Sequence, residues 1–160
     1  MDAELQTHGD IVADAIERGD DDELRAILGE ICALTGMGFA AVARVTDQHW
    51  IACQVEDKIE FGLKPGDELL IKQTICGEIR DSGEAVVFDD ASDDIKWSRH
   101  PVPVLYGFRS YCSFPVYRDD GTFFGTLCAI DPAPRRISDA DMVALLDAFA
   151  KRVGHLLSRD

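Results

Sequence analysis

The residues best able to do chemistry in this sequence of 160 residues are five cysteines. They are Cys32, Cys53, Cys76, Cys112 and Cys128, spread singly along the chain with no C-x-x-C pair among them. An odd, scattered set argues against a disulfide framework and against a structural zinc site. Because four of the five lie in apolar runs, we expect most of them to be small core residues.

A second candidate group surrounds a long connecting segment, residues 89–107, and the strand that follows it. Aromatic side chains there could give a ligand contact area, and Arg109 could bind a carboxylate or a phosphate. The alternatives are that the aromatic side chains only pack the segment onto the sheet, and that Arg109 pairs with an aspartate between residues 89 and 94. The predicted ligand-binding residues are Cys76, Trp97, His100, Leu105, Tyr106, Arg109 and Tyr111.

The groups in this segment that could hold a metal are a histidine and an acidic cluster. His100 precedes a proline in a polar stretch and lacks the further His or Cys ligands that a heme or iron–sulfur group needs, so a solvated side chain is the favoured interpretation. The cluster of Asp89, Asp90, Asp93 and Asp94 offers oxygen ligands for a hard cation but lacks the spacing of a calcium loop. A solvated turn with a helix cap is favoured there. We therefore predict no metal site, and the cofactor stays unknown.

Composition excludes several classes of partner. The formal net charge is −14 and the 16 basic residues never gather into a patch, so neither nucleic acid nor an anionic membrane surface is an expected partner. The sequence opens MDAELQTHGD, without the basic and apolar regions of a signal peptide. No apolar run reaches the roughly 18 residues of a membrane span. These features predict a cytoplasmic protein with a single main domain.

The element around which the other elements are arranged is a predicted β-hairpin over residues 108–130. Its first strand alternates with a period of two, and Asp120-Gly121 supplies the turn. In the first strand, one predicted face carries Phe108, Ser110, Cys112, Phe114 and Val116, and the other carries Arg109, Tyr111, Ser113 and Tyr117. In the second strand, one predicted face carries Phe124, Thr126, Cys128 and Ile130, and the other carries Phe123, Gly125, Leu127 and Ala129. Because neither face is strongly polar, we expect helices to cover one side of the hairpin and loops over a cavity to cover the other.

Apolar periodicity predicts the remaining elements. Helices are expected at residues 2–18, 23–35, 71–82 and from Ser138, as N-cap, to the chain end; strands are expected at 39–45, 50–55 and 85–88. The order predicts an α+β fold, an antiparallel sheet with terminal helices on one face. The apolar end of the last helix, around Val153, Leu156 and Leu157, is expected to form a homodimer or to connect to an output domain.

Two runs of residues resemble the GAF domain family. They are TICGEIRDSGEAVVFDDASDD at 74–94 and YGFRSYCSFPVYRDDGTFFGTLCAIDPAPR at 106–135, although Ala85 stands where the family's G-x-P-V strand has proline. The resemblance covers residues 21–160, after an N-terminal helix over residues 1–20, and is closest to sensory GAF domains of bacterial histidine kinases. It implies five or six antiparallel strands, a pocket under the middle helix and the long segment, a homodimer through the terminal helices, and an output kinase domain as partner.

Subtypes of this family differ in their ligands. Cyclic-nucleotide-binding members use a motif with asparagine, and this sequence contains no asparagine. Bilin-binding members attach the chromophore through a cysteine that histidine often follows, whereas no cysteine here precedes a histidine, although Cys76 or Cys112 could face the pocket. Cys76 resembles the reactive cysteine of free methionine-R-sulfoxide reductases, but residues 89–107 lack a resolving cysteine and Cys112 is a poor substitute. We predict a non-enzymatic sensory domain for a small molecule; a thiol reductase and a chromophore-binding photosensory domain are the alternatives.

Overall fold

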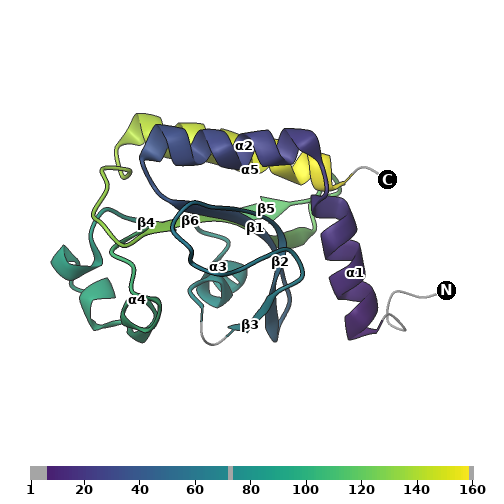
Figure 1. The fold of residues 1–160 in the computed structure, drawn as a ribbon, viewed down its shortest axis with the longest axis horizontal. Helices are drawn as coiled ribbons and strands as arrows, with labels where there is room; N and C mark the ends of the chain where they lie inside the picture. Colours follow the sequence, from purple (N-terminus) through teal and green to yellow (C-terminus); the bar gives the residue numbers. More distant parts are fainter. Residues whose placement is uncertain (1–6, 72–73, 159–160) are drawn as a thin grey trace.

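The computed structural model describes residues 7–71 and 74–158 and has the α+β architecture that the sequence predicts. Within these residues, a six-stranded antiparallel sheet has the order β3-β2-β1-β6-β5-β4 (Figure 1). The strands are β1 (Phe39–Val45), β2 (His49–Asp57), β3 (Glu68–Leu70), β4 (Val86–Phe88), β5 (Ser110–Tyr117) and β6 (Phe123–Asp131). The outermost strands, β3 and β4, have only three residues each.

Helices lie on both sides of this sheet. Two of them, α2 (Asp22–Thr35) and α5 (Ala140–Leu157), lie side by side across one face (Figure 1). The opposite face carries α3 (Cys76–Ser82) and the long segment, which contains α4 (Pro101–Tyr106) and two short 3-10 helices, Ala91–Asp93 and Trp97–Arg99. The first helix, α1 (His8–Gly19), packs against β2 at one end of the molecule.

The helix caps follow from local sequence, with one correction. For α2, the Asp21 side chain accepts a hydrogen bond from Leu24 N, and Gly36 ends the helix at a φ of 74° that favours glycine. For α5, the predicted N-cap Ser138 is wrong: Asp139 caps the helix by accepting from Met142 N. The Ser138 hydroxyl instead donates to Asp89, on the connection that follows β4. Ser138, which the local pattern favoured as the N-cap, therefore makes a tertiary hydrogen bond instead.

The end of α5 also differs from expectation. Val153 and Leu157 are fully buried and Leu156 is 5% exposed, so all three belong to the core of a single chain. They were expected to offer an association surface, and they do not. The apolar periodicity of a helix shows that one face is buried, but it does not show whether that face packs on the protein's own sheet or on a partner chain. The homodimer stays a prediction without this support.

A β-bulge corrects the predicted faces of the central hairpin. Val116 pairs with Gly125 while Tyr117 pairs with Phe123, so Phe124 is an extra residue in β6. Phe124 therefore joins the core under α2 and α5, whereas Thr126, Cys128 and Ile130 face the opposite side. Phe108, expected on the face of Cys112, also lies on the opposite side, because it precedes the first residue of β5.

Other boundaries shift modestly. α1 begins after a Thr7 capping box, and the predicted start of this helix lies outside the described residues. α3 begins only at Cys76, and residues 72–73 of the predicted helix are also outside the described range. β3 had no prediction at all. None of the helices in the described parts of the chain combines the length and the apolar character that a membrane span requires.

Candidate functional site

The sheet face opposite α2 and α5 borders a small, partly open cavity of about 50 Å³, which we term the internal cavity. Strands β1, β2, β5 and β6 form its floor, and α3, α4 and the loop after β2 form its sides. Phe39 and Ile130 are typical of its lining, which is almost wholly apolar. No charged side chain belongs to this lining among the described residues.

A larger cavity of about 480 Å³ adjoins the internal one. The two share six lining residues, which are Phe61, Leu63, Leu69, Tyr106, Phe108 and Ile130. The outer cavity adds Leu105, which is 60% exposed, and Glu60 at its rim. An outer chamber of this size falls within the roughly 300–1,000 Å³ of small-molecule sites, and its wall leads inward to the internal cavity.

A group of buried polar side chains surrounds Cys76, which lines the internal cavity. This residue opens α3 and is 3% exposed. Its sulfur lies 3.2 Å from Thr126 Oγ1, 3.7 Å from Tyr111 Oη and 3.8 Å from Ser113 Oγ. Cys128, on the same strand as Thr126, lies close enough to affect the acidity of Cys76. Three hydroxyl groups and a second thiol therefore surround one buried thiol.

These groups change the acidity of the two thiols. The interaction with Cys128 and, to a smaller extent, the hydroxyl groups of Thr126, Tyr111 and Ser113 together lower the pKa of Cys76 to about 7, against the opposing effect of burial. The same interaction, together with burial, raises the pKa of Cys128 well above its ordinary value. Burial and the charge on Cys76 likewise raise the pKa of Tyr111. Of the pair, Cys76 is the thiol that ionises first, and only a thiolate is an effective nucleophile.

Trp97 and His100, both predicted to bind a ligand, hold the covering segment in place. The Trp97 ring stacks on Phe88 at a centroid distance of 5.1 Å and lines neither of the two adjoining cavities. His100 is not the solvated side chain that was favoured. Its Nδ1 accepts from Val102 N at the start of α4, and its Nε2 lies 3.1 Å from Glu78 of α3. The position of His100 directly before Pro101 is therefore explained by its role as the N-cap of α4, not by exposure to solvent.

Arg109 lies away from Tyr111, contrary to the expectation that both line one pocket. Its guanidinium binds both carboxylate oxygens of Asp90, at 2.7 and 3.1 Å, and is about half exposed. This bond lowers the pKa of Asp90. Arg109 contributes with Trp97 to a separate hollow of about 280 Å³. The reason is that β5 starts only at Ser110, so strand alternation does not extend back to Arg109.

The acidic turn has a structural role in the described residues. Asp89 accepts hydrogen bonds from the backbone of Ile137 and Ser138, and Asp90 caps the first 3-10 helix by accepting from Ser92 N. The turn therefore joins the end of β4 to the start of α5. This agrees with the favoured interpretation of a capped turn.

The structure thus divides the predicted site residues into groups. Cys76, Tyr106 and Tyr111 line the internal cavity, and Leu105 lines only the outer one. Trp97, His100 and Arg109 lie elsewhere. That any of them binds a ligand stays a prediction.

Sequence reasoning missed the polar partners of Cys76 and the loop that closes the cavity. Thr126 and Cys128 had been assigned to one face, and Ser113 to the face of Tyr111. The signal was incomplete, because the register set by the Asp-Gly turn alone would pair Ser113 with Leu127, and it is the bulge at Phe124 that pairs Ser113 with Cys128. Phe61 and Leu63, in contrast, lie in a loop for which the sequence pattern gave no prediction.

Comparison with known proteins gives a family and a fold. A family model described as the GAF domain matches residues 21–157. The search of curated proteins returned no match. Among solved structures, the GAF domain region of a protein assigned as a membrane protein of Geobacter sulfurreducens PCA superposes with a TM-score of 0.69 at 15% identity, covering 92% of this chain and 97% of that one.

Two further structures have named functions of their own. A type II free methionine-R-sulfoxide reductase from Thermoplasma acidophilum has a TM-score of 0.64 at 13% identity, with 92% of this chain and 95% of that chain covered. A domain of a protein assigned as a two-component sensor histidine kinase of Sinorhizobium meliloti 1021 has a TM-score of 0.56 at 13% identity, with 84% of this chain and 88% of that chain covered. Likeness at these identities establishes the fold, whereas function depends on the site.

Proposed function

Because the chain belongs to the GAF domain family, whose members are typically small-molecule-binding sensory domains, we propose that it binds a small, uncharged and largely apolar molecule. The ligand occupies the outer cavity and directs one polar group inward to Cys76 and Tyr111. The protein is a non-enzymatic sensor in this proposal, cytoplasmic, and coupled to an output kinase domain.

The observation that carries this function is the chemistry of the cavity wall. Apart from Glu60 in the outer one, apolar and aromatic side chains line both chambers, and the described part of the internal wall has no charged group. A small set of hydroxyl and thiol groups lies at its inner end. Such a wall gives affinity through apolar contact and orients the ligand through few hydrogen bonds. An anionic ligand is disfavoured, because Arg109 already binds Asp90 and lies elsewhere.

A route from the cavity to the opposite face is also present. Tyr111 and Cys128 face the cavity, while their strand neighbours Cys112 and Leu127 pack under α2 and α5. A ligand that binds one arrangement of α4 and the adjoining loops more tightly than another would shift these strands between two states. The terminal helices would then carry the signal, within a homodimer or toward the kinase.

Occupancy of the cavity can be tested by closing it. Leu63 lines both chambers, so Leu63→Trp should fill the passage between them. Native mass spectrometry of protein purified from its own host should find a bound small molecule, and Leu63→Trp should reduce the occupied fraction by at least about tenfold. Leu34→Trp is the matched control, because Leu34 is 44% exposed on α2, across the sheet. Equal occupancy in both variants, or no retained molecule in wild type, would contradict the proposal. A visible absorption band would instead favour the chromophore-binding alternative.

A thiol reductase is the second candidate, and the presence of Cys76 and Cys128 together in the wall of the internal cavity is the observation that favours it. Cys112, considered in the sequence only as a poor substitute for a resolving cysteine, lies in the core under α2 and α5, whereas Cys128 lies beside Cys76. In such a reaction, the Cys76 thiolate attacks the sulfoxide sulfur, methionine leaves, and Cys76 becomes a sulfenic acid. The Cys128 thiol then condenses with it, giving a disulfide and water.

This reaction is disfavoured because Cys76 and Cys128 are only 3% and 6% exposed. We expect no turnover of free methionine-R-sulfoxide in an assay coupled to thioredoxin. Turnover that both Cys76→Ser and Cys128→Ser abolish, and that Cys112→Ser preserves, would establish the enzyme instead of the sensor.

A further inference from the structure

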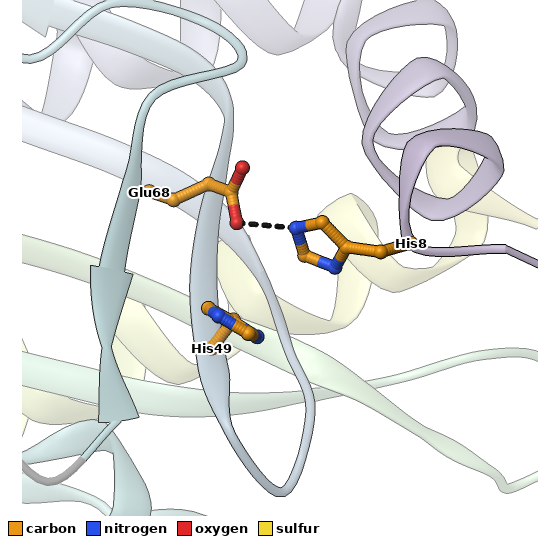
Figure 2. Close-up of side chains that lie close together, drawn as sticks. All are labelled: His8, His49 and Glu68. Carbon is orange, nitrogen blue, oxygen red and sulfur yellow. Dashed lines mark hydrogen bonds and ion pairs between the residues drawn. The ribbon is translucent and has the colours of Figure 1, made fainter.

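Three side chains that could bind a metal ion meet at the end of the molecule that carries α1. His8 is the first residue of α1, His49 the first of β2 and Glu68 the first of β3. Figure 2 shows the three side chains close together, with the His8 ring joined to the Glu68 carboxylate and the His49 ring beside them. One nitrogen of each ring and one carboxylate oxygen all lie within 4.8 Å of one another.

The fold brings these residues together through the register of the sheet. Glu68 pairs with Ile51, which lies two residues after His49 on β2. Residues two apart on a strand share a face, so His49 and Glu68 lie on the side of the sheet that Ile51 faces. α1 packs against β2 on that side, and the Thr7 capping box with Asp10 fixes the backbone at His8.

The contacts within the group leave metal-binding capacity unused. His8 Nε2 lies 2.6 Å from Glu68 Oε1, and the His8 and His49 rings are 4.6 Å apart at an angle of 44°. The His49 ring makes no hydrogen bond to any described residue, although it is only partly exposed. An ion pair between His8 and Glu68 needs no second imidazole, so it does not explain why His49 lies here.

We propose that His8, His49 and Glu68 bind a divalent transition-metal ion of the zinc class, which joins α1 to the sheet. Two imidazole nitrogens and one carboxylate oxygen are a common zinc ligand set, whereas Mg²⁺ and Ca²⁺ require oxygen ligands. Tetrahedral zinc places its ligand atoms about 3.3 Å apart, so small rotations of these side chains suffice. Three protein ligands leave the fourth position for water.

The consequence of such an ion concerns a helix outside the part of the chain that matches the family model, residues 21–157. At its other end, α1 is joined to the end of α5, because Arg18 donates to the Leu157 carbonyl oxygen at 2.7 Å. A metal at His8 would fix the beginning of α1 as this bond fixes its end. Zinc would then stabilise the packing of α1 on β2.

The experiment is a zinc titration by calorimetry on the full chain, with any histidine tag removed. Wild type should bind one Zn²⁺ per chain with a Kd below about 10 µM. His49→Ala and the nearly isosteric Glu68→Gln should each weaken binding by at least about 100-fold, since loss of a mere outer-shell partner already costs 10–100-fold. Circular dichroism checks that each variant is folded.

The matched control is His155→Ala. His155 also lies against a carboxylate, at 3.1 Å from Asp119, but belongs to no three-residue group among the described residues. It should leave zinc affinity unchanged within twofold, and zinc should raise the melting temperature of wild type and of this control but not of His49→Ala. A wild-type Kd weaker than about 10 µM, or a loss below tenfold in either ligand variant, would overturn the proposal.

Discussion

The two faces of the sheet use the same residue type in opposite ways. On the face under α2 and α5, burial raises the pKa of Cys53 and of Cys112 to about 12. On the cavity face, hydrogen bonds lower the pKa of Cys76 to about 7 although this residue is as deeply buried. Burial alone disfavours the thiolate, so its acidity here depends on nearby donors.

The same difference extends to packing. The helix-covered face is a continuous apolar core in which strands, α2 and α5 leave little space. The cavity face keeps hollow volume and a cluster of polar groups beneath short helices. We therefore expect substitutions on the first face to change mainly stability, and those on the second to change mainly chemistry.

The largest effect should come from removing a ring from the helix-covered core. Phe114 is 2% exposed in that core, and Phe114→Ala should destabilise the fold by about 3–5 kcal/mol. Phe108 is 5% exposed but borders both cavities, so Phe108→Ala should lower the free energy of unfolding clearly less than Phe114→Ala does. Urea denaturation of both variants measures the difference. Equal losses would show that the cavity face is packed as tightly as the other.

The next effect tests the close approach of α5 to the hairpin. A Cβ at Gly154 would lie 2.1 Å from the Tyr117 carbonyl oxygen, so Gly154→Ala should destabilise the protein by about 1–3 kcal/mol. Gly29 of α2 is the control, because a Cβ there meets nothing within 4 Å. Gly29→Ala should stabilise by up to about 1 kcal/mol through helix propensity. Thermal unfolding that moves both variants in the same direction would contradict this contrast.

A smaller effect should distinguish the thiols by pH. Between pH 7 and 9 the native Cys76 releases a proton that the unfolded chain retains, so its contribution to stability rises with pH, by at most about 1.4 kcal/mol per unit. Cys112, with its raised pKa, gives a contribution that is complete below pH 9 and is lost only as pH rises toward 12.

Urea midpoints at pH 7, 8 and 9 measure this difference. The stability gap between wild type and Cys76→Ser should widen with pH, while the gap for the control Cys112→Ala should not widen and should begin to narrow only near pH 9. Parallel behaviour of the two variants would argue against an acidic Cys76.

The smallest effect should come from Arg109, at the rim of the cavity face. Because its bond with Asp90 is exposed to solvent, Arg109→Ala should lower the melting temperature only slightly. It should leave the amount of retained ligand unchanged, since Arg109 lines neither adjoining cavity. Loss of ligand with an unchanged melting temperature would show instead that Arg109 contributes to ligand binding.

Sequence patterns predicted what depends on local periodicity. The hairpin, α2 and the covering segment over residues 89–107 follow from alternation, caps and prolines, and the α+β fold follows from their order. The bulge at Phe124 did not follow, because every neighbour of Phe124 is compatible with either face. Beyond one extra residue in a strand, every following side chain points to the opposite face of the sheet.

The candidate site was less accessible to prediction, for a related reason. Cys76 and Tyr111 were found because aromatic and thiol groups are conspicuous in sequence. Cys76 and Cys128 are far apart in the chain, and only the packing of α3 on β6 brings them together. His8, His49 and Glu68 were missed for the same reason, since β3 has only three residues and shows no period.

The brevity of β3 and β4 has a consequence for behaviour at high concentration. The outermost strand of a sheet exposes backbone N–H and C=O groups that another chain can pair with, and long, flat edges promote aggregation. Here each boundary strand offers only three residues for such pairing. Glu68 places a negative charge on one of them, and a net charge of −14 makes copies repel each other. Growth of the sheet from one molecule into the next is thereby disfavoured, and concentrated solutions should resist fibril formation.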